Sequence, residues 1–442
     1  MWVLYFFGGR SMERQLRRYI APNILAMVGT SCYVLADTFF ISIAEGANGI
    51  TALNLVLPIY GLIFAIGSMI GIGSATRFSL CRSAGDDGDA YFSNSVFWTL
   101  IISAVFVLSG IFFPDKILSL LGADEQIMSV GLPYTRIFLC FTPFFMLNYT
   151  FTAFVRNDNA PKLAMMATLL SGIFNIVFDY IFMFPMNLGM IGAALATGVS
   201  PIVSMSICMI HYMSKRNTIV FKKTLPSIKR LVSACSLGVV ALVGELSSGI
   251  TTLVFNFILL GLSGNTAVAA YGVIANIALV GTALLNGVSL GLQPVASTAH
   301  GRMDFESEKK VYKHALIIAE CIAAVVVAAV LLFGDQLVAV FNSENSPELA
   351  AYASIGLRVY FVGFLIAAAN MIRSGFYSAT GKGVESSVIA LSRGIVSISA
   401  MAFLLSRLFG VTGVWLAFPA AEIITLLISI LMSVWKTKRD NR

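Results

Sequence analysis

Charged residues are scarce in this chain. Lys, Arg, Asp and Glu together make up 12% of its 442 residues, whereas hydrophobic residues make up 58%. A soluble domain usually carries about twice that share of charge, and a chain longer than about 300 residues cannot hide so much apolar surface in one water-surrounded core. The composition therefore excludes a water-soluble globular fold and predicts a protein whose solvent is lipid.

The residues that usually build metal centres, disulfides and active sites are few and scattered. The sequence contains no CxxC pair, no metal-ligand spacing, no glycine-rich phosphate loop and no nucleophile beside a base. We therefore expect no enzyme and no resident cofactor. The six cysteines stand singly, and we interpret them as small apolar packing residues: Cys32, Cys81, Cys140, Cys208, Cys235 and Cys321.

Long apolar runs fill most of the chain. A helix that crosses about 30 Å of hydrocarbon needs about 20 mostly apolar residues, and runs of that length, cut by Gly, Pro or charge, predict twelve transmembrane helices in an all-α polytopic membrane protein. Their expected limits are 19–43, 50–76, 91–113, 128–154, 161–184, 189–213, 232–260, 266–297, 312–333, 348–378, 386–407 and 411–435.

The basic residues give these spans an orientation. Most of the 29 lysines and arginines fall in the termini and in alternate loops, and the opposite loops hold only Lys116 and Arg407. This bias predicts a multi-pass protein of the cytoplasmic (inner) membrane with both termini in the cytoplasm. The net charge of +7 therefore reflects topology and indicates no nucleic-acid partner. Four arginines lie inside spans, where we expect them to reach toward the helix ends: Arg136, Arg358, Arg373 and Arg393.

The chain repeats itself once. Residues 52–73 align with 270–291 at an offset of 218, and LGMIGAALA (188–196) aligns with FGVTGVWLA (409–417) at an offset of 221. Six spans separate the copies, so both halves have the same orientation. We expect two six-helix lobes related by a pseudo-twofold axis along the membrane normal, an arrangement typical of secondary transporters.

The repeat and the charges together predict the domain organisation. The expected segments are a cytoplasmic N-terminal segment (1–18), an N-lobe (19–213), a basic cytoplasmic linker (214–231), a C-lobe (232–435) and a cytoplasmic tail (436–442). A pump with its site between two lobes of one chain needs no second copy, so we expect a monomer in contact with membrane lipid.

Polar residues in the first half have no counterpart in the second. Asp37 aligns with Phe255, and Asn175, Asp179 and Thr197 align with Val396, Ala400 and Phe418. The four polar residues fall at a similar depth of spans 1, 5 and 6, so they can meet. Acids inside a membrane are costly and mark function by default. The cluster can bind a proton or a small alkali cation such as Na+; alternatively, it only holds the helices together.

Two further features concern movement and substrate. Pro22 lies fifteen residues before Asp37 and frees a backbone carbonyl, which permits a bend in span 1 or a static kink. In span 7, Glu245, Thr252 and Asn256 share one helical face. Such a stripe should line a cavity, although pairing of Glu245 with Arg373 is an alternative.

Several motifs resemble the multidrug and toxic compound extrusion (MATE) family, in its prokaryotic MepA- and DinF-like branches. They are ADTFFI (36–41), FNIVFDYIF (174–182), GMIGAALAT (189–197), SAGD (83–86) and SATGK (378–382). The resemblance covers nearly the whole chain. It implies export of lipophilic, often cationic drugs by antiport against H+ or Na+, with a coupling-cation site at the positions of Asp37, Asn175, Asp179 and Thr197. It also implies that Glu245 contacts substrate cations.

Other functions fit less well. A flippase for lipid-linked saccharides needs basic residues around its anionic cargo, and this sequence offers arginines only toward span ends. The motifs do not match a transporter of the major facilitator type, and a channel needs no two-lobed repeat.

Overall fold

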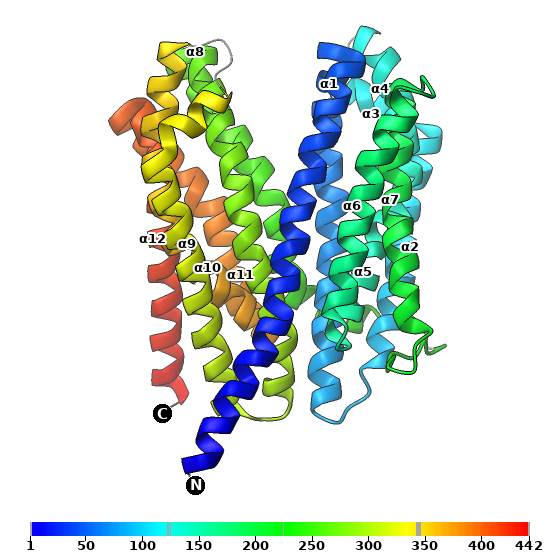
Figure 1. The fold of residues 1–442 in the computed structure, drawn as a ribbon, viewed down its shortest axis with the longest axis vertical. Coiled ribbons are helices and arrows are strands. Elements are labelled where there is room, and N and C mark those ends of the chain that lie inside the picture. The colour runs from blue at the N-terminus through cyan, green and yellow to red at the C-terminus, as the bar shows by residue number, and fades with distance from the viewer. Residues whose placement is uncertain (1, 122, 124, 224, 342–345, 441–442) are drawn as a thin grey trace. The chain divides into compact units, whose positions relative to one another are not determined.

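The computed structural model describes residues 2–121, 123, 125–223, 225–341 and 346–440. Within these residues all regular structure is helical (Figure 1). Of the expected terminal segments, residues 1 and 441–442 lie outside the described residues. The helices are α1 (Trp2–Ser83), α2 (Asp89–Phe112), α3 (Pro114–Leu120), α4 (Glu125–Cys140), α5 (Thr142–Asn157), α6 (Pro161–Met183), α7 (Gly189–Tyr212), α8 (Ile228–Gly301), α9 (Phe305–Phe341), α10 (Pro347–Ala379), α11 (Gly383–Leu391), the π-helix η1 (Ser392–Val396) and α12 (Ser397–Asp440).

Helix lengths agree with twelve membrane crossings. Ten described helices are long and apolar enough to span a bilayer, and α4 with α5, bent by 45°, supplies another crossing. The segment Gly383–Ser433 has 51 residues, which extend over about 77 Å at 1.5 Å per residue. It turns at Gly410, whose φ of 57° is not helical. This segment therefore supplies two crossings, which completes the predicted number.

Some helices extend beyond their hydropathy limits at both ends. The seventh span was expected at 232–260 and extends over Ile228–Gly264, and the ninth was expected at 312–333 and extends over Phe305–Ala339. Hydropathy marks only the part that needs lipid, and helices continue beyond it because their backbone hydrogen bonds do not end there. The fourth span is broken between Cys140 and Thr142, and Pro143 in the first turn of α5 has no N–H group.

The chain divides into two compact units. Unit 1 contains residues Met1–Ile20, Val243–Ala299 and Asp304–Arg442, and unit 2 contains Ala21–Leu242 and His300–Met303. Helices α1 and α8 therefore each contribute to both units. In α1 the division falls at Ile20/Ala21, directly before Pro22, which lies within the helix.

Each unit has an aromatic core. In unit 2 the ring of Tyr60 stacks on Phe138 with centroids 3.6 Å apart. In unit 1 Tyr360 stacks on Phe418 at 4.2 Å, and Trp415 is fully buried. Aromatic burial of this kind contributes most of the packing energy of a core. It gives each unit a rigid frame for its polar residues.

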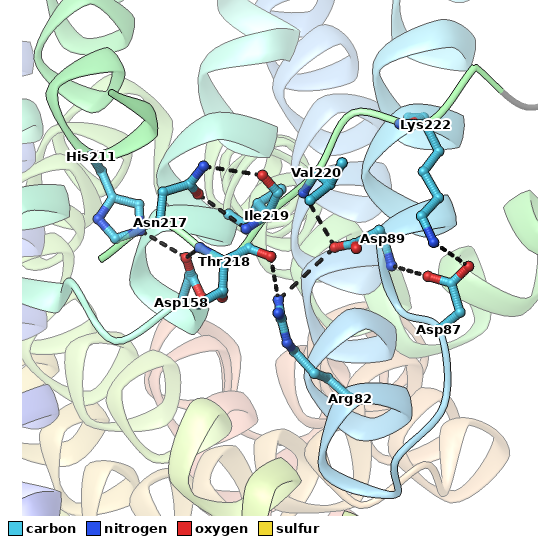
Figure 2. Close-up of polar contacts among 11 residues, drawn as sticks. Arg82, Asp87, Asp89, Asp158, His211, Asn217, Thr218, Ile219, Val220 and Lys222 are labelled. Atoms are coloured by element: carbon cyan, nitrogen blue, oxygen red, sulfur yellow. Dashed lines mark hydrogen bonds and ion pairs between the residues drawn. The ribbon is translucent and has the colours of Figure 1, made fainter. Parts of the chain in front are cut away.

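A buried acid outside the linker holds the start of the linker between the repeats (Figure 2). Asp158 follows α5, and its Oδ2 lies 2.8 Å from His211 Nε2. The same oxygen accepts the backbone N–H of Thr218 at 2.8 Å, and the Thr218 hydroxyl donates to Oδ1. Both Asp158 and His211 are buried. One carboxylate thus joins the end of α5, the end of α7 and the linker.

Further contacts continue along the linker. Arg82 Nη1 donates to the carbonyl of Thr218 at 2.7 Å (Figure 2). Farther on, the backbone N–H of Ser227 donates to Asn94 Oδ1 at 2.7 Å. Since all of these partners belong to unit 2, residues 217–223 and 225–227 are anchored to that unit.

We expect Asp158→Asn to release the linker. The change removes the charge that several donors share inside the protein, and charge-assisted hydrogen bonds of this kind contribute about 1.5–3 kcal/mol each. Limited trypsin digestion at Lys215, Arg216 and Lys223 should become faster, and thermal unfolding should occur at a lower temperature.

Asp87→Asn is the matched control for this variant. Asp87 also binds the linker, through Lys222 Nζ at 2.7 Å (Figure 2), and that hydrogen bond lowers the pKa of Asp87 below its usual range. The pair is exposed, however, and exposed pairs stabilise little. Equal digestion of Asp158→Asn, Asp87→Asn and wild type would contradict the anchoring role of Asp158.

Candidate functional site

Helices α6 and α7 form a hairpin that brings Asn175 and Thr197 together. Asn175 Nδ2 donates to Thr197 Oγ1 at 3.3 Å. The chain reverses between the helices through Asn187 (φ 52°) and Gly189 (φ 49°). This turn aligns the two helices so that residues ten to twelve positions from it face each other.

A carboxylate from α1 fixes the start of α7. Glu45 Oε1 accepts the backbone N–H of Met190 at 3.3 Å, and a negative group at a helix N-terminus is favourable. A Cβ atom on Gly189 would lie 2.2 Å from the same oxygen, so the contact needs glycine there. The end of the first span is thereby tied to the helix that carries Thr197.

The two acids of the expected cluster lie in the same unit and interact. Asp179 is fully buried on α6 and Asp37 is half-buried on α1. The charge of Asp37 acts on Asp179. No lysine or arginine among the described residues lies within ion-pairing distance of either acid. The structure thus brings all four predicted residues into one region of unit 2, with two acids and no fixed counter-charge.

Several oxygens of this cluster are buried and receive no hydrogen bond from the part of the chain that the structure describes. They are Asp37 Oδ1, Asn175 Oδ1 and both carboxylate oxygens of Asp179. Buried acceptors without a donor cost free energy, and buried charges cost more. The donor set consists of carboxylate, amide and hydroxyl oxygens, which suits a proton or a small hard cation. The described residues contain no group of three or more His, Cys, Asp or Glu that could hold a metal ion.

Two tyrosines that sequence reasoning missed complete the region. The hydroxyls of Tyr60 and Tyr134 are 2.5 Å apart, and the charge of Asp37 acts on both. Tyr134 is fully buried on α4. A buried tyrosine hydroxyl needs a polar partner, but no spacing in the sequence links positions 60, 134 and 37.

The predicted stripe of the seventh span lies on α8 in unit 1. Asn256 Oδ1 is buried without a donor, and Thr252 lies beside the Tyr271 hydroxyl. Glu245 is half-buried. Arg373, the alternative partner for Glu245, donates from Nη1 to Ser429 Oγ at 2.6 Å. The stripe therefore belongs to a different unit from the acidic cluster.

Besides the acidic cluster and the stripe, there is a third polar group, which lies in unit 1 and was not predicted. Glu422 on α12 is 1% exposed, and Arg393 Nη2 lies 2.7 Å from its Oε1. The expectation that Arg393 reaches toward a helix end is therefore wrong. A buried carboxylate attracts the guanidinium inward more strongly than the distant interface does. By contrast, Arg358 pairs with the exposed Asp335 at 2.8 Å.

Comparisons with known proteins agree along almost the whole chain. The sequence profile of the MatE family matches residues 22–181 and 241–404. Multidrug export protein MepA of Staphylococcus saprophyticus is 28% identical over 434 residues, which are 97% of this chain and 95% of that protein. MepA of Staphylococcus aureus (strain MRSA252) is 26% identical over 437 residues, with 97% and 95% covered.

Solved structures share the fold. A MATE transporter in complex with MaL6 matches with a TM-score of 0.90 at 23% identity, over 97% of both chains. The outward-facing conformation of a multidrug resistance MATE family transporter matches with a TM-score of 0.89 at 22% identity, over 97% of this chain and 96% of that one. These likenesses support the all-helical, two-lobed plan of twelve spans. Because the profile covers most of the chain and MepA proteins align along nearly all of it, this chain belongs to the MatE family of multi-span membrane transporters, in its MepA-like multidrug efflux branch.

Proposed function

We propose that this transporter exports lipophilic, often cationic organic compounds in exchange for protons or sodium ions. The coupling cation binds at Asp37, Asn175, Asp179 and Thr197. The exchange takes place across the cytoplasmic (inner) membrane, with both termini in the cytoplasm, and a monomer is sufficient for it. The relatives named MepA are multidrug export proteins, which supports drugs and toxins as the substrate class.

The observation that carries the proposal is the uncompensated acid pair. Asp37 and Asp179 interact, and no described basic residue pairs with them. A carboxylate in this position is stabilised when a proton or cation arrives and is destabilised when it leaves. The occupancy of such a site therefore depends on the ion concentration to which it is exposed, so that an ion gradient can drive it, as antiport requires. A cluster that only held the helices together would do so by hydrogen bonds, and two acids without a basic partner among the described residues would not add to its stability.

Ion binding must alter the path of the substrate. In the proposed cycle the N-lobe (19–213) and the C-lobe (232–435) alternate access of the substrate to the two sides of the membrane, and the linker (214–231) follows the N-lobe. A bend of the first span at Pro22 connects the charge state of Asp37 to this motion. The division of α1 between units directly before Pro22 supports a change of direction there, since a helix shared by two moving bodies must deform at their boundary.

Substrate cations are proposed to contact Glu245 in the C-lobe, with Thr252 and Asn256 beside it. The buried Asn256 Oδ1 has no donor among the described residues, so it can accept a hydrogen bond from a protonated amine. A carboxylate gives such a compound a counter-charge, whereas apolar walls would accept neutral compounds equally well.

We expect Asp37→Asn to abolish coupled transport and leave the fold intact. The protein would be reconstituted in vesicles, and uptake of a fluorescent lipophilic cation would be followed under an imposed proton gradient and then a sodium gradient. The wild type should respond to at least one gradient, which identifies the ion. The variant should fall to the level of protein-free vesicles, because the remaining acid no longer has a charged neighbour to share the cation.

Asp335→Asn is the control, since it removes an exposed acid far along the chain from the cluster. Normal gradient-driven transport by Asp37→Asn would sink the assignment of the site. Failure of the wild type under both gradients would instead favour the flippase alternative, and fluorescent lipid-linked saccharides would then be tested.

We expect Glu245→Gln to narrow the substrate range toward neutral compounds. The substitution keeps the shape and hydrogen bonding of the side chain but removes its charge, so export of organic cations should fall while export of neutral compounds persists. Export of a matched cationic and neutral pair would be compared in cells and vesicles. Glu320→Gln, an acid of α9 outside the stripe, is the control. Unchanged export of the cation would contradict the role of Glu245.

A further inference from the structure

The buried carboxylate of unit 1 is surrounded by nitrogen donors. Arg393 donates to Glu422 Oε1 from Nε at 3.1 Å and from Nη2 at 2.7 Å. Asn370 Nδ2 donates to the other carboxylate oxygen at 2.8 Å and to the Glu422 carbonyl at 2.9 Å. The acid is completely enclosed, and its charge is balanced by one cation from the same unit.

The helix that supplies this cation is locally irregular. Arg393 lies in the π-helix η1, where the N–H of Ser397 reaches the carbonyl of Ser392 five residues earlier. Short π-helical segments are rare and occur frequently at functional sites. The hydroxyl of Ser392 also contacts Ser397 Oγ at 2.9 Å and Thr425 Oγ1 at 3.0 Å. The irregular turn is therefore held in place by side chains next to the ion pair.

Polar side chains extend from this pair along facing sides of α10 and α12. On α10 Arg373 follows Asn370 by three residues, and on α12 Ser429 follows Glu422 by seven, which places each on the same side as its neighbour. Arg373 binds Ser429. Asn370 Oδ1, in contrast, is buried and has no donor in the described part of the chain. Glu422 and Asn370 thus supply a carboxylate and an additional oxygen without a described donor, and both favour a cation.

This arrangement is the counterpart in unit 1 of the acidic cluster in unit 2, but its cation is covalently attached. It is no copy made by the repeat, because at the offset of 221 Glu422 aligns with Pro201 and Arg393 with Gly172. We infer that Glu422 and Asn370 form a second buried cation-binding site, which the guanidinium of Arg393 occupies permanently. The site takes monovalent cations, and Arg393 keeps protons and sodium ions out of it.

If the N-lobe exchanges ions as in the proposed function, Arg393 affects how many ions are transported. While Arg393 is present, ion exchange is confined to the N-lobe. When Arg393 is removed and Glu422 is kept, the enclosed carboxylate must take a cation from solution, because an uncompensated buried charge is too costly. The variant should then bind an additional proton or sodium ion and move it in each cycle.

Chemical rescue tests the site without relying on transport. Arg393→Ala should lower the temperature of thermal unfolding in detergent, and millimolar methylguanidinium, sodium ions or acidic pH should restore it. Tetramethylammonium, which has no N–H donor, should restore less at the same concentration. Arg393→Ala/Glu422→Gln removes acid and cation together and should respond to none of these additions. Arg393→Lys keeps an attached cation and should remain as unresponsive as the wild type.

Each result decides the question. Equal responses of Arg393→Ala and the double variant, or no response of either, would overturn the inference and leave the pair as a packing contact. If Arg393→Ala cannot be purified, a stable Arg393→Ala/Glu422→Gln variant would still support the inference, because the unpaired Glu422 is then the cause of the instability. If neither variant can be purified, the inference is overturned. In vesicles, Arg393→Ala should show a higher ion-to-substrate ratio than the double variant. A wild type without gradient-driven transport would refute the proposed function but leave the rescue result valid.

Discussion

The cost of burying a charge governs both units. An ion moved from water into a helical bundle loses several kcal/mol of solvation even after the protein relaxes, so each buried acid must acquire a counter-charge. In unit 1 Arg393 supplies it from η1. In unit 2 the described residues offer Asp37 and Asp179 none, and their unpartnered oxygens must be satisfied from outside the chain. The same cost thus holds Arg393 beside Glu422 and, in the proposed function, makes Asp37 and Asp179 dependent on solution ions.

Glycine contacts bring part of α8 into unit 2. A Cβ on Gly73 would lie 2.2 Å from the carbonyl oxygen of Ala234, and one on Gly238 would lie 2.0 Å from that of Met69. Two backbones approach this closely only where side chains are absent, as at many membrane helix interfaces. The first turns of α8 are therefore fastened to unit 2, together with the anchored linker before them.

Hydropathy predicted the number and type of spans because lipid imposes a simple rule of length and apolarity. The acidic cluster was predictable because Asn175 and Asp179 lie four apart on one helix. Glu422 was missed because it is a single acid within an apolar run, and its partners Arg393 and Asn370 are 29 and 52 residues away. Tyr134 was missed because its partner Tyr60 is 74 residues away in the sequence. The π-helix has no periodic signature in the sequence.

The repeat explains why the two units can differ in chemistry while sharing a fold. Phe255, which aligns with Asp37, is fully buried and packs on Tyr271 at 4.9 Å, so this position is apolar core in unit 1. The acid of unit 1 stands instead at a position that is Pro201 in unit 2. Helix packing constrains the outline of each lobe but not which buried positions are charged, provided that each charge is balanced. A duplicated transporter can therefore keep one lobe responsive to an ion gradient and make the other insensitive to it, by placing one arginine beside one carboxylate.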